Sequence, residues 1–130
     1  DVAQIFDIFL KRVNERFTLH RTNSRRMKRV LAYIGEHLQE NPSVYELAMC
    51  AGMERSYFAR RFKEIFLMSP SHFIYTQKMS VGAKSLLSGS TVKQAASECG
   101  YSDEKAFSRA FKKYMEISPS EYKKCHIEQP

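Results

Sequence analysis

Two short runs of polar and basic residues, each built around a pair of phenylalanines, hold the side chains best suited to recognising another molecule. The runs contain Arg55, Ser56, Ala59, Arg60 and Lys63, and then Glu104, Lys105, Ser108, Arg109 and Lys112. Arginine can donate two hydrogen bonds to a guanine edge, glutamate can accept from cytosine, serine can do either, and an alanine methyl can touch a thymine methyl. These residue types predict contacts to base edges in double-stranded DNA.

A helix must hold such side chains outward, and the phenylalanines provide the means. Phe58 and Phe62 are four residues apart, as are Phe107 and Phe111, so each pair shares one helix face that can be buried. The other residues of each run then point away from the core. A solvated helix face is the alternative for any single basic residue, but both runs repeat the pattern in register.

Arg60 and Arg109 take the same place in the two runs and are the first candidates for base contacts. Glu104 has two possible roles. It could contact a base, or it could interact favourably with the helix amino terminus, where a carboxylate is stabilised by the helix dipole. For Lys112 and the adjacent Lys113, contact with phosphate or water is favoured over contact with bases.

The runs belong to a longer internal repeat. A short apolar segment ending at Gly52 recurs at Gly100, 48 positions later, and each run closes on a Ser-Pro pair, at Ser69 and at Ser118. A short helix, a glycine turn and a basic helix form the pattern of a helix-turn-helix unit. The sequence therefore predicts two such units.

Capping signals mark where the helices begin. Ser43 with Glu46, Thr91 with Gln94, and Ser118 with Glu121 have the spacing of a capping box. Free amides at these amino ends, and at the Ser69 turn, could also bind phosphate, and the two roles are compatible. Four tyrosines could add phosphate contacts, although packing is favoured for most of them: Tyr57, Tyr75, Tyr114 and Tyr122.

The apolar pattern is helical throughout, which predicts an all-α fold. We expect two helix-turn-helix subdomains joined by a long linker helix, plus an extra amino-terminal helix. The predicted segments are an amino-terminal helix and basic connector at 1–22, a first subdomain at 23–70, a linker helix at 71–88 and a second subdomain at 89–130. The extra helix carries one apolar stripe, which favours packing on its own core over pairing with a second chain. The connector at 18–26 is the predicted hinge, and the helix that follows it should stop at Asn41-Pro42.

Composition narrows the function classes. The 130 residues carry a net charge of +7, which favours a polyanionic partner, and no apolar run approaches a membrane span. No signal peptide is visible, which predicts a soluble, cytoplasmic protein, and a DNA partner would make it nucleoid-associated. Cys50, Cys99 and Cys125 are expected to be reduced thiols, with redox sensing as the minor alternative. Since no catalytic set, metal-ligand spacing or glycine-rich phosphate loop is present, we predict no enzyme, no metal and no cofactor.

From about Val30 to Lys124 the chain resembles the DNA-binding region of AraC/XylS-type transcription regulators. The matching pieces are Glu46-Leu-Ala48, Ser56-Tyr-Phe-Ala-Arg-Arg-Phe-Lys63, Lys78-Met79 with Ala83 and Leu86-Leu87, Cys99-Gly-Tyr-Ser-Asp103, Phe107-Ser-Arg-Ala-Phe-Lys-Lys113 and Ser118-Pro-Ser-Glu-Tyr122. The resemblance implies seven helices, two helix-turn-helix units and sequence-specific promoter binding. It leaves open RNA polymerase as a further partner, and a dimer formed through an additional amino-terminal domain.

The chain departs from this family at several helix ends. Leu67 and Glu116 stand where the family usually has glycine, so either the turn geometry shifts or these residues accept a strained backbone. Glu54 replaces the usual serine or aspartate cap, which predicts a weaker helix start, whereas Asp103 keeps the expected cap. Gly82 interrupts the linker helix and requires a close helix contact to explain it. The competing function is a helical protein-interaction module that uses the Phe and Met stripes as partner grooves.

Overall fold

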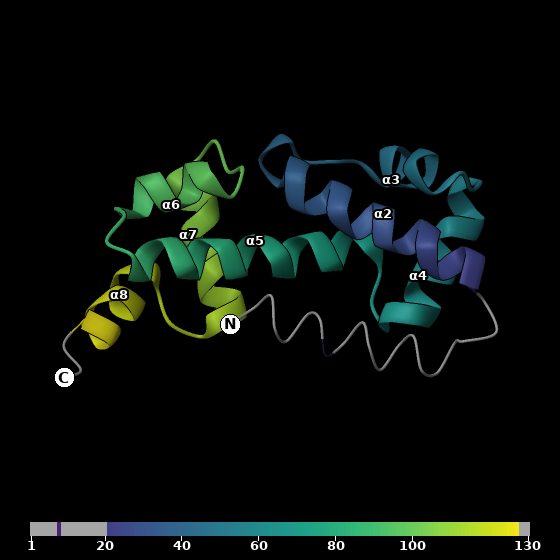
Figure 1. Ribbon diagram of the computed structural model, residues 1–130. Helices are drawn as coiled ribbons and strands as arrows, with labels where there is room; N and C mark the ends of the chain where they lie inside the picture. Colours follow the sequence, from purple (N-terminus) through teal and green to yellow (C-terminus); the bar gives the residue numbers. More distant parts are fainter. Residues whose placement is uncertain (1–7, 9–20, 128–130) are drawn as a thin grey trace. The chain divides into compact units, whose positions relative to one another are not determined.

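The computed structural model describes residue 8 and residues 21–127. Within these residues the chain forms seven α-helices, one 3₁₀ turn and no strand (Figure 1), which confirms the all-α class. The elements are α2 (Arg21–His37), η2 (Leu38–Glu40), α3 (Val44–Ala51), α4 (Arg55–Phe66), α5 (Pro70–Leu87), α6 (Val92–Glu98), α7 (Glu104–Met115) and α8 (Pro119–Ile127). Apart from Ile8, the predicted amino-terminal helix lies outside the described residues.

The described chain divides into two compact units. Of the described residues, one unit includes 21–37 and Pro42–Phe73, and the other includes Leu38–Asn41 and 74–127. The first contains α2, α3 and α4, and the second contains α6, α7 and α8. Helix α5 passes from the first unit into the second as one continuous helix, which confirms the predicted long helix.

The predicted hinge at residues 18–26 is wrong from Arg21 onward, because α2 already begins there. The polar composition suggested a connector, but arginine is among the better helix formers. The helix is also held by its apolar side, where Met27, Val30 and Ile34 are buried. Packing of that side therefore extends the helix through a sequence that looks like a linker.

The helix starts follow the predicted caps, but the reciprocal bond of a capping box is recorded at Thr91 and not at Ser43 or Ser118. Thr91 and Gln94 form the full capping box, whereas Ser43 accepts from the Glu46 amide at 3.1 Å without the reciprocal bond. The Glu46 carboxylate is engaged elsewhere: it accepts from the Tyr33 hydroxyl of the neighbouring α2 at 3.1 Å and from the Ser43 hydroxyl at 3.3 Å. A partner on another helix thus outcompetes the local cap amide.

The two helix ends at which the expected glycine is absent nevertheless have a left-handed backbone. Leu67 and Glu116 adopt left-handed φ values of 63° and 69°, and their amides donate to the carbonyls of Lys63 and Lys112. A left-handed conformation costs a residue with a side chain roughly 1–2 kcal/mol. The chain therefore accepts a strained backbone at these positions rather than a different turn.

Each unit packs around the predicted phenylalanines. In the first unit Phe58, Phe62 and Phe66 of α4 are buried, and the Phe62 ring lies 5.4 Å from that of Phe73. In the second unit α6, α7 and α8 lie around the carboxy-terminal part of α5 (Figure 1). That core contains Met79, Leu86, Ala95, Ala96, Cys99, Phe107, Phe111 and Tyr122. Both basic helices are therefore anchored by the face that the sequence predicted.

Gly82 of α5 lies directly against Phe107 of α7. A Cβ at this position would lie 2.7 Å from Cε1 and 2.9 Å from Cζ of the ring, closer than van der Waals contact allows. This is the close contact that the sequence required to explain a glycine inside a long helix. The missing side chain lets α7 approach α5.

Gly82→Ala is expected to destabilise the second unit, although alanine is the better helix former by about 1 kcal/mol. The Phe107 ring is fully buried against Tyr101 and Phe111, so it cannot withdraw, and overpacking costs about 1–3 kcal/mol. Urea unfolding followed by circular dichroism should show a lower midpoint. Gly35→Ala is the matched control, since a Cβ there meets nothing within 4 Å, and it should raise the midpoint. A raised midpoint for Gly82→Ala would contradict this prediction and show that the Phe107 ring can move aside.

Candidate nucleic-acid interface

The first candidate set lies together on the outer face of α4. Phe58 and Phe62 fill the inner face, and at 100° per residue the five candidates fall within an arc of about 140°. The side chains of Arg55, Ser56, Arg60 and Lys63 are exposed, and Ala59 is half-buried. The helix thus presents all five on one side.

Helix α7 repeats this arrangement in the second unit. Phe107 and Phe111 are fully buried on the inner face, and the candidates occupy the positions equivalent to those on α4. Glu104, Lys105, Arg109 and Lys112 are exposed, and Ser108 is half-buried. The structure thus groups the residues of each set, and the two sets belong to different units.

The candidate cations are available to a partner. In the part of the chain that the structure describes, a salt bridge joins Arg61 Nη1 and Glu64 Oε2 at 2.9 Å. Arg61 is the immediate neighbour of Arg60 but is turned toward the protein and half-buried. Arg60 and Arg109 are exposed and take no part in that pair, so their guanidinium groups keep all donors for an external acceptor.

The amino end of α4 is better capped than the sequence predicted. Both carboxylate oxygens of Glu54 accept backbone amides, from Ser56 at 3.0 Å and from Tyr57 at 2.9 Å. The Ser56 hydrogen bond, followed by the Tyr57 bond, lowers the pKa of this carboxyl below its ordinary value of 4.5. Asp103 caps α7 as expected, with Oδ1 accepting from the Lys105 amide at 3.0 Å. Glu104 is exposed beside that cap, and both of its predicted roles stay open.

Glu54→Ala is expected to destabilise the first unit at neutral pH, with the effect vanishing in acid. Because the folded-state pKa is depressed, the stabilisation is fully present above pH 4.5 and is lost as pH falls through the lowered pKa. Thermal unfolding of both proteins between pH 7 and pH 2 measures the difference. Glu36→Ala, which removes another exposed carboxylate of this unit, is the control for the loss of a negative charge alone. A pH-independent loss in Glu54→Ala would contradict the capping role.

The other helix starts are capped by hydroxyl groups. Ser69 Oγ accepts from the His72 amide and Ser118 Oγ accepts from the Glu121 amide, both at 3.2 Å. Capping is thus observed at Ser43, Thr91, Ser69 and Ser118, while phosphate binding there stays a prediction. At the start of a helix, a side-chain cap of this kind satisfies one of four free amides, so others remain for a ligand.

The four tyrosines separate into two groups. Tyr122 is buried, and the Tyr75 hydroxyl donates to the Ala110 carbonyl at 2.7 Å, with burial raising the pKa of Tyr75. Tyr57 and Tyr114 are exposed, and the Tyr114 ring packs edge-on against that of Tyr75 at 5.7 Å. Packing therefore accounts for Tyr75 and Tyr122, and the exposed pair keeps hydroxyl groups at the surface.

A basic surface on α2 was missed by the sequence analysis. Arg25, Lys28 and Arg29 are exposed on the side of α2 opposite Met27 and Ile34. The first turn of α2 contains no acidic residue, and cations are unfavourable at the amino end of a helix. A helical projection of residues 21–37 would have revealed this face, but residues 18–26, which include Arg25, were interpreted as a connector.

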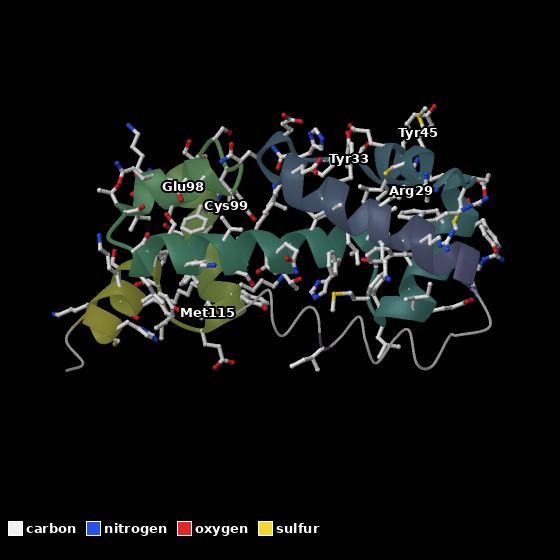
Figure 2. The ribbon with its side chains drawn as sticks, viewed as in Figure 1. Arg29, Tyr33, Tyr45, Glu98, Cys99 and Met115 are labelled. Atoms are coloured by element: carbon white, nitrogen blue, oxygen red, sulfur yellow. The ribbon has the colours of Figure 1, made fainter. Side chains whose placement is uncertain are left out.

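The cysteines are free thiols in different environments. Cys99 is buried at the end of α6 (Figure 2), where its Sγ donates to the Ala95 carbonyl at 3.1 Å. Burial raises the pKa of Cys99 to about 11, so its reactive thiolate form is scarce at neutral pH. Cys50 is half-buried and Cys125 is exposed. Within residues 21–127 and Ile8, no group of three His, Cys, Asp or Glu residues could hold a metal ion.

Residues 47–124 match a family model described as a helix-turn-helix domain, which covers more than half of the chain. The chain belongs to the AraC/XylS-type helix-turn-helix family. The match includes α4, α5 and α7, and therefore every candidate residue of both sets. This family consists of DNA-binding domains of transcription regulators and is not an enzyme class.

Relatives and solved structures agree with this assignment. The chain is 33% identical over 92 residues to the "Probable transcriptional regulator LumQ" of Photobacterium leiognathi, a match that covers 69% of this chain and 37% of that protein. It is 30% identical to the DNA-binding domain of AdpA, a global transcriptional factor solved in complex with a target DNA, with a TM-score of 0.70 over 75% of this chain and 88% of that one. An AraC-type regulator from Chromobacterium violaceum has a TM-score of 0.74 over 82% and 96% of the two chains at 19% identity, which shows the shared fold.

The chain thus spans about a third of the length of the curated relatives that it matches first. Among the described helices, none is long and apolar enough to cross a membrane.

Proposed function

We propose that this AraC/XylS-type chain binds specific DNA sites as part of a transcription regulator, with α4 and α7 entering successive segments of the major groove. The observation that most strongly supports this proposal is that both units present the same arrangement of exposed residues. Arg60 and Arg109 are exposed at equivalent positions, each backed by two buried phenylalanines. The AdpA domain, a solved relative with this fold, was captured on its target DNA, which supports the same partner here.

The two kinds of contact would contribute differently. Arg60 and Arg109 would donate pairs of hydrogen bonds to guanine edges and set sequence preference, with the other outward residues of each set beside them. Arg25, Lys28 and Arg29 of α2 would contact phosphates, which adds affinity without sequence preference. Neutralising phosphates releases counterions, so binding should weaken as salt concentration rises.

Helix α5 has the dimensions for a spacer between two such contacts. Its 18 residues span about 27 Å at 1.5 Å per residue, and major-groove segments on one face of a duplex recur about every 34 Å. Both recognition helices would then use one DNA molecule, as predicted for a site of two major-groove segments. Chromosomal DNA as partner implies a cytoplasmic, nucleoid-associated location.

A protein contact is the second candidate function, and one observation favours it. Tyr45 and Met49 of α3 are 60% and 64% exposed and lie one helical turn apart (Figure 2 labels Tyr45). RNA polymerase, or a second copy of the chain, are partners that such a surface could take. The predicted protein-interaction module cannot use the phenylalanine pairs of α4 and α7 as partner grooves, because all four rings are fully buried.

Selection from a pool of randomised duplexes tests the proposal directly. The chain should enrich one motif with two conserved segments about one helical turn apart, and bind it far more tightly than an unselected duplex. Affinity for both duplexes should fall steeply between low and moderate salt. Failure to enrich any motif, together with salt-insensitive or absent DNA binding, would favour the protein-interaction module.

A further inference from the structure

A four-residue segment lies between two helices of the first unit but belongs to the second. Leu38–Asn41 connects α2 to α3, and it clusters with the residues from Ile74 onward. The chain therefore crosses between the units after His37, after Asn41 and after Phe73. Helix α5 provides one of these crossings, and the segment provides the other two.

The segment is fixed within the second unit by specific polar contacts. Asn41 Nδ2 donates to the carbonyl oxygen of Gly100 at 3.1 Å, and Lys78 Nζ donates to Asn41 Oδ1. Gly100 is the turn residue between α6 and α7, so the segment contacts the turn that leads into the recognition helix. We call Asn41, Lys78 and the Gly100 carbonyl the clasp.

Steric fit reinforces the clasp. A Cβ on Gly100 would lie 2.9 Å from the carbonyl oxygen of Gln39, so the turn and the segment touch backbone to backbone. Asn41 adopts a left-handed φ of 54°, a conformation that asparagine tolerates better than most residues. The close approach at Gly100 is specific to this docking, since the equivalent Gly52 meets nothing within 4 Å.

Lys78 is an unusual residue to bury for packing alone. It is 9% exposed, its Nζ lies 5.1 Å from the centre of the Tyr101 ring, and burial lowers its pKa. A desolvated ammonium is costly unless it is hydrogen-bonded. Its position over Tyr101 compensates part of that cost, and its bond to Asn41 does so only while the segment is docked.

We propose that the clasp couples the two units, so that Asn41 and Lys78 are positioning residues for DNA binding. A change in the relative orientation of the units must either lift Asn41 from Gly100 and Lys78 or distort the chain at both ends of the segment. Coupling keeps the second recognition helix at high effective concentration once the first has bound. The DNA part of this inference rests on the proposed function, whereas the coupling itself does not.

The coupling is testable without DNA. Asn41→Gly removes the amide but retains a residue suited to φ 54°, and Lys78→Met removes the donor while keeping the length of the side chain. Residual dipolar couplings measured separately for the two units should give alignment tensors of equal magnitude in the wild type. In either variant the magnitudes should differ, because motion between the units averages one set of couplings. Equal magnitudes in both variants would overturn the proposal.

DNA binding provides the second readout. Duplexes carrying both selected segments, or one segment with the other randomised, are titrated with wild type, Asn41→Gly and Lys78→Met. Affinity for the two-segment duplex should fall about 10-fold, with little change on one-segment duplexes. Binding of the one-segment duplexes also shows that each unit remains folded.

Lys84→Met is the matched control, since it removes an exposed lysine from the same helix. It loses the same charge as Lys78→Met and should affect one-segment and two-segment duplexes alike. Equal losses on all duplexes in the clasp variants would indicate a purely structural role and overturn the proposal. If the wild type binds no duplex selectively, the proposed function fails, and the dipolar couplings still decide whether the clasp couples the units.

Discussion

Replacing Arg60 or Arg109 with alanine is expected to reduce the free energy of specific DNA binding by about 1–3 kcal/mol each, which corresponds to about 5- to 150-fold in affinity. Each side chain is exposed on the outer side of its helix and would contact a base edge with two hydrogen bonds. The two sites lie on different units, so the losses should add in the double variant. Gel-shift titration on the selected duplex measures specific binding, and titration on an unrelated duplex measures non-specific binding.

The comparison between duplexes separates base contacts from phosphate contacts. Arg60→Ala and Arg109→Ala should weaken the selected duplex much more than the unrelated one. Arg29→Ala removes the same kind of side chain from the exposed face of α2 and should weaken both duplexes equally, with a smaller salt dependence. Should Arg60→Ala behave like Arg29→Ala, Arg60 would be a phosphate contact rather than a base contact.

The repeat explains why so much of this fold could be predicted from the sequence. Phe58 and Phe62 repeat as Phe107 and Phe111, and a pattern that occurs twice in register identifies the buried face of both helices independently of the exact boundaries. The capping residues Thr91 and Asp103 act through neighbours within three positions, so their geometry is local and visible in the sequence. Both candidate sets face outward for the same local reason.

Features that depend on contacts between distant residues could not be predicted. The Asn41–Gly100 hydrogen bond joins residues 59 positions apart, and nothing near Asn41 in the sequence indicates that partner. Glu46 illustrates a smaller case: its spacing from Ser43 predicted a capping box, yet the Tyr33 hydroxyl on α2 takes one of its oxygens (Figure 2 labels Tyr33). Polar composition similarly hid the start of α2, because burial of Met27 and Val30 decides it.

Gly100→Ala is expected to destabilise the second unit by about 2–5 kcal/mol. Its φ of 88° lies in the left-handed region, which costs a residue with a Cβ about 1–2 kcal/mol. The new Cβ would also lie 2.9 Å from the Gln39 carbonyl oxygen, a backbone atom that cannot move away without shifting the segment, and such overpacking costs about 1–3 kcal/mol. Urea unfolding measured by circular dichroism should show a lower midpoint for the transition of this unit.

Gly52→Ala separates the two causes, because it keeps one and lacks the other. Gly52 is the equivalent turn residue of the first unit, with a φ of 67° and no atom within 4 Å of an added Cβ, so it should lose only the conformational cost of about 1–2 kcal/mol. The excess loss in Gly100→Ala then measures how firmly Gln39 is held against the turn. Equal losses in the two variants would mean that residues 38–41 move away easily, and in that case they could not couple the units.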